Sequence, residues 1–158
     1  MINNVLLDEK GRIYIPKSSM LRESEKILLK RENDLTFSLY DFNEFNKRIE
    51  LLKSKREEAF EQGDIQKFEL ISNYINLKII DVFYEIKKDS QDRILLPKMI
   101  RQMYEIEKSI LLFELLDRVN VFKNFEQCDE YKRELSKKFS DMLNFFFCYS
   151  NYICYNGL

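Results

Sequence analysis

The 158-residue sequence contains no histidine and no tryptophan, and it has only three glycines, two prolines and three cysteines. The lack of histidine excludes Ser-His-Asp triads, histidine general bases and histidine-ligated metal sites. The few glycines and prolines exclude collagen-like and low-complexity chains. Cys128, Cys148 and Cys154 are odd in number and have no metal-site spacing, so we expect neither a disulfide framework nor a zinc site. A reducing cytoplasmic compartment fits this cysteine usage best.

Neither sign of charge dominates, because 26 Lys and Arg residues face 27 Asp and Glu residues and leave a net charge of −1. This balance excludes a globally basic nucleic-acid-binding protein, although it allows a local basic patch. No run approaches the roughly 18–20 apolar residues that a membrane span needs. The hydrophobic share of 45% and the charged share of 34% are typical of a folded domain.

An internal repeat organises what is present. The segment DEKGRIYIPK, beginning at Asp8, is echoed by DSQDRILLPK, beginning at Asp89, which is 81 residues later (89 minus 8). Farther along, the tripeptide ILL at 27–29 recurs at 110–112. Agreement at several points in the same order indicates two copies of one unit.

Both copies predict the same elements. An Asp-x-x-Gly-Arg sequence favours a turn, alternating apolar residues favour a strand, and the following proline ends that strand. Asp41 with Glu44, and Asn124 with Gln127, are typical of helix N-terminal capping boxes. The apolar stripe of the first long helix is expected to be core or a subunit interface. The expected strands are 13–15, 26–30, 35–40, 82–86, 94–96, 109–113 and 119–122. The expected helices are 17–23, one from Asp41 to Gly63, 65–78, 98–104 and 124–143. The apolar stripe of the helix at 65–78 is expected to consist of Phe68, Ile71, Ile75 and Ile79.

The two spaced motifs, D-x-K-G-R-h-x-h-P and D-x-x-x-R-h-x-h-P-x-x-h-R (h is apolar), resemble those of the MraZ family, over about residues 5–140. This family consists of bacterial transcriptional regulators with two tandem AbrB-like units. The resemblance implies an α+β fold with a mostly β core, a double-split β-barrel of the AbrB/MraZ type with flanking helices. It also implies a homo-oligomeric ring of about eight subunits that binds direct repeats in a promoter of the division and cell-wall gene cluster, including its own gene.

The resemblance places the DNA-contacting side chains on the two Asp-Arg segments. We expect Arg12 and Arg93 near bases, because arginine reads guanine bidentately, and lysines on phosphates. Residues 8–31 hold seven basic and four acidic side chains, and residues 87–108 hold six and four, so both segments are locally basic. The predicted DNA-binding residues are Lys10, Arg12, Lys17, Arg22, Arg93, Lys98 and Arg101.

The chain departs from the family pattern at two places. Asp92 stands where the second copy usually has glycine. In the first copy, Met20 occupies the position of the P-x-x-h-R arginine, and Arg22 follows two residues later.

Other interpretations of the same residues remain. Arg12 and Arg93 could each form a salt bridge with the aspartate four residues before it, with no role in binding. The chain could be an AbrB-type antitoxin or regulator of another operon, or an oligomeric scaffold that has lost DNA binding. No nucleophile–base pair or metal cluster is visible, so we expect no enzymatic activity and no cofactor.

The repeat divides the chain into four parts. We expect a first AbrB-like unit with its helix at 1–63, a connecting helix at 64–80, a second unit with its helix at 81–143, and an aromatic C-terminal tail at 144–158. The tail is expected to pack on its own subunit or on a neighbour. The protein is expected in the cytoplasm, associated with the nucleoid.

Overall fold

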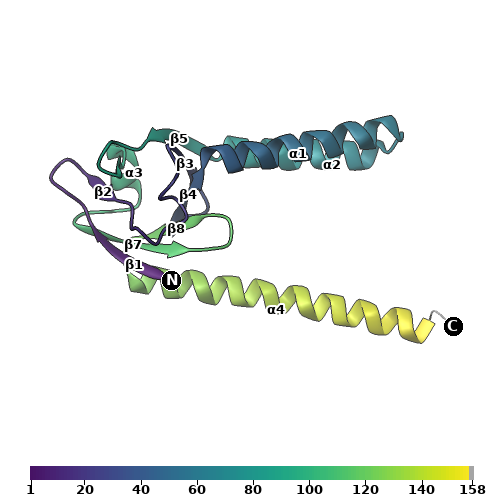
Figure 1. Cartoon of the computed structure of the whole chain (residues 1–158). Coiled ribbons are helices and arrows are strands. Elements are labelled where there is room, and N and C mark those ends of the chain that lie inside the picture. The colour runs from purple at the N-terminus through teal and green to yellow at the C-terminus, as the bar shows by residue number, and fades with distance from the viewer. Residues whose placement is uncertain (157–158) are drawn as a thin grey trace.

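The computed structural model describes the backbone of residues 1–156 and the side chains of residues 1–144 (Figure 1). Over this part the fold is α+β, with two antiparallel sheets and flanking helices. The strands are β1 (Ile2–Leu6), β2 (Arg12–Tyr14), β3 (Lys26–Arg31), β4 (Thr36–Asp41), β5 (Val82–Lys87), β6 (Arg93–Leu95), β7 (Ser109–Glu114) and β8 (Val119–Phe122). The helices are α1 (Phe42–Glu61), α2 (Ile65–Ile80), α3 (Lys98–Met103) and α4 (Phe125–Asn156).

The strand order is symmetric with respect to the two halves of the chain. The larger sheet runs β1-β7-β8-β4-β3-β5, and the smaller sheet pairs β2 with β6. Replacing each strand of one half by its counterpart in the other half reverses the order and leaves it otherwise unchanged. β1 pairs with β7 of the second half, and β5 pairs with β3 of the first half, so the halves exchange their first strands. The described pairing leaves β1 and β5 as edges and does not close the sheet into a barrel.

The main core lies between the two sheets. Ile13 and Ile94, which are register partners in the β2–β6 pair, are both fully buried. They belong to one cluster with Ile27 and Leu29 of β3 and with the matching side chains of β7. Because neighbouring residues of a strand point to opposite faces, the alternate residue Leu28 joins a second cluster on the other face.

Helices cover that other face, and each half of the chain supplies its own helices. Leu28 packs with Phe45 and Ile49 of α1 and Ile75 of α2. In the second half, Leu111 and Phe122 pack with Cys128 of α4. Figure 1 shows α1 and α2 side by side as a hairpin and α4 as a separate long helix, all extending away from β2.

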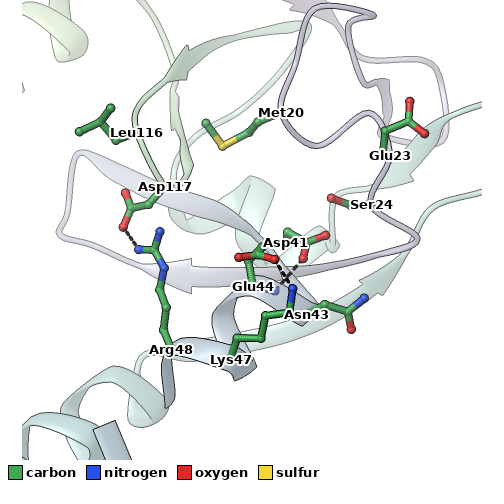
Figure 2. A pocket seen from close by; sticks show the side chains of 10 residues that line it. All are labelled: Met20, Glu23, Ser24, Asp41, Asn43, Glu44, Lys47, Arg48, Leu116 and Asp117. Carbon is green, nitrogen blue, oxygen red and sulfur yellow. Dashed lines mark hydrogen bonds and ion pairs between the residues drawn. The ribbon is translucent and has the colours of Figure 1, made fainter. Parts of the chain in front are cut away.

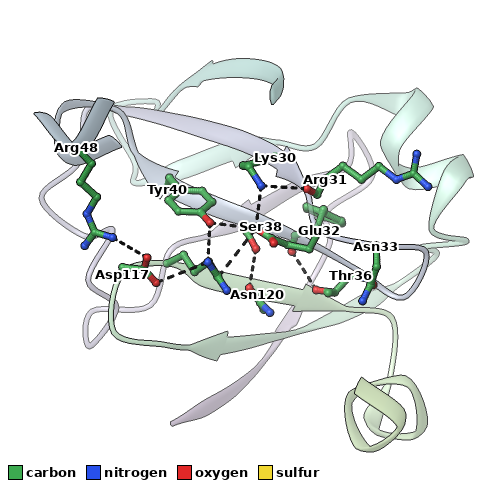
Figure 3. A network of polar contacts seen from close by, with 12 residues as sticks. Lys30, Arg31, Glu32, Asn33, Thr36, Ser38, Tyr40, Arg48, Asp117 and Asn120 are labelled. Atoms are coloured by element: carbon green, nitrogen blue, oxygen red, sulfur yellow. Dashed lines mark hydrogen bonds and ion pairs between the residues drawn. The ribbon is translucent and has the colours of Figure 1, made fainter. Parts of the chain in front are cut away.

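A polar network joins the halves where β4 meets β8 (Figure 3). The buried hydroxyl of Ser38 donates to Asn120 Oδ1 at 2.6 Å, and these two residues are register partners. Nearby, Tyr40 donates to Glu32 and accepts from Arg118. Burial, followed by the neighbouring Glu32 carboxylate, raises the pKa of Tyr40, so its hydroxyl stays protonated as a donor. The Ser38–Asn120 and Tyr40–Arg118 bonds cross between the halves and contribute to joining them.

Most of the expected elements are confirmed, and both caps are formed. Asp41 Oδ1 accepts from the amide of Glu44, and Asn124 Oδ1 from the amide of Gln127. One expected helix is wrong, because residues 17–23 form a chain of turns. The Ser19 amide donates to the Pro16 carbonyl and the Arg22 amide to the Ser19 carbonyl, so each of these hydrogen bonds joins residues three apart. Within residues 17–23 no hydrogen bond joins residues four apart, as an α-helix requires.

Two expectations in the helical part are also corrected. The last helix does not end at 143, because the backbone of α4 continues to Asn156. No proline or glycine interrupts the sequence before Gly157, so nothing ends the helix earlier. The predicted packing of the tail concerns side chains outside the described residues. On α2, Ile75 is buried, but Ile79 is about half exposed.

Among residues 1–156, none of the helices is both long enough and apolar enough to cross a membrane.

Candidate nucleic-acid interface

The first Asp-Arg segment forms a turn that fixes its own arginine. Asp8 Oδ1 accepts the amides of Lys10 and Arg12, both at 2.9 Å, and Asp8 Oδ2 accepts Arg12 Nε at 2.6 Å. Gly11 closes the turn with its amide on the Asp8 carbonyl and has a φ of +81°, a conformation that favours glycine. The aspartate therefore sets both the turn and the direction of the guanidinium.

The second segment repeats this geometry. Asp89 Oδ1 accepts the amides of Gln91 and Arg93 at 2.9 Å, and Asp89 Oδ2 accepts Arg93 Nε at 2.8 Å. Asp92 takes the place of the glycine with a φ of +58°. The salt bridges that the four-residue spacing allowed are thus present for both arginines. Both bonds use Nε, which leaves the terminal nitrogens of Arg12 without a hydrogen bond among the described residues.

The two turns lie at opposite ends of the β2–β6 ribbon, because β2 and β6 are antiparallel and each turn precedes one strand. Each turn also accepts an amide from the end of the other strand, Leu96 onto the Gly11 carbonyl at 3.1 Å and Ile15 onto the Asp92 carbonyl at 2.9 Å. Figure 1 places β2 at the end of the molecule opposite the free tips of the helices. The two turns and the outer face of the ribbon, where Tyr14 and Leu95 are about half exposed, therefore lie at one end of the molecule.

An arginine from beyond each proline reaches the other copy's turn. Arg101 of α3 donates from Nε to the Leu96 carbonyl, and its guanidinium covers Gly11, where an added Cβ would lie 2.5 Å from Arg101 Cζ. Arg22 donates to the Ile15 carbonyl at 2.9 Å and pairs with Asp92 at 2.6 Å. The structure thus puts Arg22 and Arg101 in corresponding places, although they lie at different distances after their prolines.

The three lysines of the predicted set, Lys10, Lys17 and Lys98, have exposed side chains. Among the described residues, their ammonium groups make no ion pair and no hydrogen bond. All seven predicted residues therefore lie on or beside the two turns and the segments that follow the ribbon.

Hydrogen bonds within the turns shift the pKa values of Asp8, Asp89 and Arg93. The Arg12 amide is the largest influence at Asp8 and, with the guanidinium, lowers the pKa of that carboxyl. At Asp89, burial is the largest influence and raises the pKa, but the amide and guanidinium of Arg93 outweigh it, so the net change is a lowering. The bond to Asp89 in turn raises the pKa of Arg93. Both carboxylates and the Arg93 guanidinium are therefore charged at neutral pH.

Sequence reasoning missed two neighbours of the turns. Tyr14 of β2 is about half exposed, and the Arg93 guanidinium lies over its ring at 5.8 Å from the centroid. Lys88 pairs with Asp92 at 3.0 Å. The four-residue spacing of Lys88 and Asp92 was a signal for this pair, whereas the Tyr14 contact depends on the register of β2 with β6 and has no local signal.

A cleft lies elsewhere, between the segment before β3, the start of α1 and the β7–β8 turn (Figure 2). Four of its charged side chains form ion pairs: Arg48 with Asp117 at 2.6 Å, and Lys47 with Glu44 at 2.7 Å. It is open to solvent and contains both signs of charge, so it lacks the uniformly basic lining that a nucleic acid needs. Within the described part of the chain, no group of three or more potential metal ligands is present.

Comparison with known proteins finds a relative but no matching protein family. No protein-family model matches the chain. The chain is 25% identical over 136 residues to a transcriptional regulator MraZ from Caldanaerobacter subterraneus subsp. tengcongensis, and the match covers 86% of this chain and 87% of that protein. The chain is therefore similar, at low identity, to a protein named as a transcriptional regulator and not as an enzyme.

Proposed function

We propose that this protein is a sequence-specific DNA-binding transcriptional regulator of the MraZ type. The observation that carries this proposal is the pair of matching Asp-Arg turns at the two ends of one exposed ribbon. A two-stranded ribbon can enter the major groove of DNA as a helix can. The similarity to a transcriptional regulator over most of the chain supports the same function.

Within this function, Arg12 and Arg93 contact base edges, and Lys10, Lys17, Lys98, Arg22 and Arg101 contact phosphates. The aspartates orient the two base-reading arginines, as a partner on Nε leaves the two Nη groups to face a guanine. We propose further that residues 1–63 and 81–143 are two AbrB-like units, joined by residues 64–80. In this proposal the two sheets together are a double-split β-barrel, which agrees with the exchanged first strands.

The target in this proposal is a set of direct repeats in the promoter of the division and cell-wall gene cluster that includes the protein's own gene. One chain offers few phosphate contacts and a net charge of −1, so a single copy would bind weakly. A homo-oligomeric ring of about eight copies would multiply these contacts. Exposed apolar side chains along the helices, such as Leu70, Leu77 and Leu135, supply surface for such assembly. The protein would act in the cytoplasm, at the nucleoid.

The test is fluorescence anisotropy with the DNA upstream of this protein's gene and a scrambled duplex, from about 50 to 200 mM salt. We expect sequence-dependent binding that weakens steeply with salt. The double variant Arg12→Ala/Arg93→Ala should lose specific binding while the oligomer persists in sedimentation. Arg56→Ala/Arg133→Ala is the matched control, because it removes the same charge from two helices and should leave binding unchanged.

The ion pairs of Arg12 and Arg93 also favour the alternative that the protein is an oligomeric scaffold without DNA binding. In that case a folded, oligomeric sample would show no preference between the two duplexes at any salt concentration. Wild-type affinity in the Arg12→Ala/Arg93→Ala variant would instead disprove the assignment of the site.

A further inference from the structure

Each turn is contacted by one arginine from the other half of the chain, Arg101 at the first turn and Arg22 at the second, and the two turns differ in the charge that faces this arginine. At the first turn, the guanidinium of Arg101 lies over Gly11, and no carboxylate of the described residues pairs with it. At the second turn, the Asp92 carboxylate lies 2.6 Å from Arg22 Nη2. The two arginines are thus placed alike, but only the second one has its charge neutralised within the chain.

Asp92 holds a second cation as well. Its Oδ1 lies 3.0 Å from Lys88 Nζ, and the same ammonium donates to the carbonyl of Arg22. Only 10% of the Lys88 side chain is exposed, compared with 29% for Arg22. One carboxylate therefore binds two cations, and Lys88 is also held against the backbone that carries Arg22.

The backbone of the second turn does not need this carboxylate. The turn is closed by Asp89, and its link to the ribbon is the bond from the Ile15 amide to the Asp92 carbonyl, which matches the bond at Gly11. The positive φ at position 92 disfavours an aspartate relative to glycine. What Asp92 adds to the second turn is therefore its negative charge, at some cost in backbone strain.

We propose that Asp92 makes the two DNA-binding turns unequal, so that the first turn binds phosphate strongly and the second turn is restrained by its own internal acid. A phosphate that approaches Arg101 meets an uncompensated guanidinium. A phosphate that approaches Arg22 or Lys88 must displace Asp92 and is repelled by it. Asp92 is thus an affinity-setting residue that makes each chain bind mainly through its first turn. This inference rests on the proposed DNA binding.

The test compares Asp92→Asn with wild type. Asparagine has the same shape and accepts a left-handed backbone, so the variant keeps the turn and removes only the charge. Glu61→Gln, an exposed residue at the tip of α1, is the control with the same change in net charge. Binding is measured by anisotropy with the upstream duplex over the same salt range, and by the salt concentration at which each protein elutes from heparin.

Freeing Arg22 and Lys88 should tighten duplex binding about tenfold at low salt and steepen the salt dependence by about two counterions per engaged turn. Glu61→Gln should change neither quantity. A second pair of variants tests the inequality directly: Arg101→Gln should weaken binding several-fold, whereas Arg22→Gln should have little effect unless Asp92 is also replaced.

The outcomes separate this inference from the proposed function. Failure of the wild-type protein to bind DNA, with later heparin elution and DNA binding in Asp92→Asn, would refute the function as proposed and support the inference. Equal behaviour of Asp92→Asn and Glu61→Gln on both DNA and heparin would overturn the inference, whether or not the wild type binds. Weaker binding by Asp92→Asn would also overturn it, because Asp92 would then be holding Arg22 in a binding position.

Discussion

Residues 2–41 and 82–122 contribute four strands each, in the same sequence and with corresponding pairing, but the segments around those strands differ. After the first proline the chain makes successive turns, whereas after the second it forms α3. The first half is followed by the α1–α2 hairpin, and the second by the single long helix α4.

The difference follows the burial of each position. Ile13 and Ile94 pack against each other's neighbours in one core, so a change in either would disturb both halves. Gly11 and Asp92 lie outside that core: Asp92 is partly exposed, and Gly11 is covered by the Arg101 guanidinium. The two copies are therefore alike where the halves share a core and differ outside that core.

The largest expected effect tests the equality of the two halves in the core. Ile13→Ala and Ile94→Ala each remove a fully buried side chain, and we expect each to lower the free energy of unfolding by about 2–5 kcal/mol. The two losses should agree within about 1 kcal/mol, as the residues are register partners in one cluster. Urea unfolding measures both. If either variant does not fold, the valine variants, with expected losses of about 0.5–1.5 kcal/mol, allow the same comparison.

The next largest loss of stability is expected where the halves meet, between β4 and β8. Ser38→Ala removes the partner of buried Asn120 Oδ1, and Asn120 Nδ2 has no partner among the described residues, so we expect a loss of about 1–3 kcal/mol. Ser54→Ala on the exposed face of α1 is the control and should change stability by no more than about 0.5 kcal/mol. Equal small effects from both serines would show that the polar pair does not help to join the halves.

The sequence predicted the fold well wherever local signals and the repeat agreed. The strand β4, the short helix α3 and both capped helices follow from alternation, a proline and the Asp41 and Asn124 caps. The exchange of β1 and β5 between halves could not be predicted, because strand pairing across about 80 residues leaves no local pattern. Residues 17–23 were mispredicted because a side chain competes with the backbone for their amides: Ser19 Oγ accepts the Leu21 amide at 3.2 Å.

For the candidate site, the sequence supplied the residues but not their partners. The turn bonds from Asp8 to Arg12 were foreseeable, since the two residues lie four apart within a turn-forming sequence. The approach of Arg101 to Gly11 and of Arg22 to Asp92 joins opposite halves of the chain, so only the structure reveals it. This is why Asp92 stood out in the sequence as an irregularity but could not be given a role.

A smaller effect compares the helices that follow each half. Asp41→Ala and Asn124→Ala remove the side-chain acceptor of one N-terminal amide each, and we expect losses of about 1 kcal/mol. Asp41 should matter slightly more, because its negative charge also interacts with the positive end of the α1 dipole. Thermal unfolding with matched Asp41→Asn separates the two contributions: this variant should retain the cap and lose only the charge. A larger loss from Asn124→Ala would reverse the expected order.

The smallest effect is the pH dependence contributed by the two turns. The pKa of Asp8 and that of Asp89 are lower in the folded protein than their ordinary value of 3.8. The unfolded chain therefore binds more protons than the folded chain just below that value, so stability rises with pH through this range. The contribution is fully present above pH 3.8 and is lost as the pH falls through the lower folded values.

Asp8→Asn and Asp89→Asn should each remove part of this slope, measured as the melting temperature between about pH 2.5 and 6. The loss should be at least as large for Asp8, because bonds to Arg12 dominate there, whereas burial opposes the lowering most strongly at Asp89. A slope that neither substitution changes would mean that the turn bonds persist in the unfolded chain or do not form in solution.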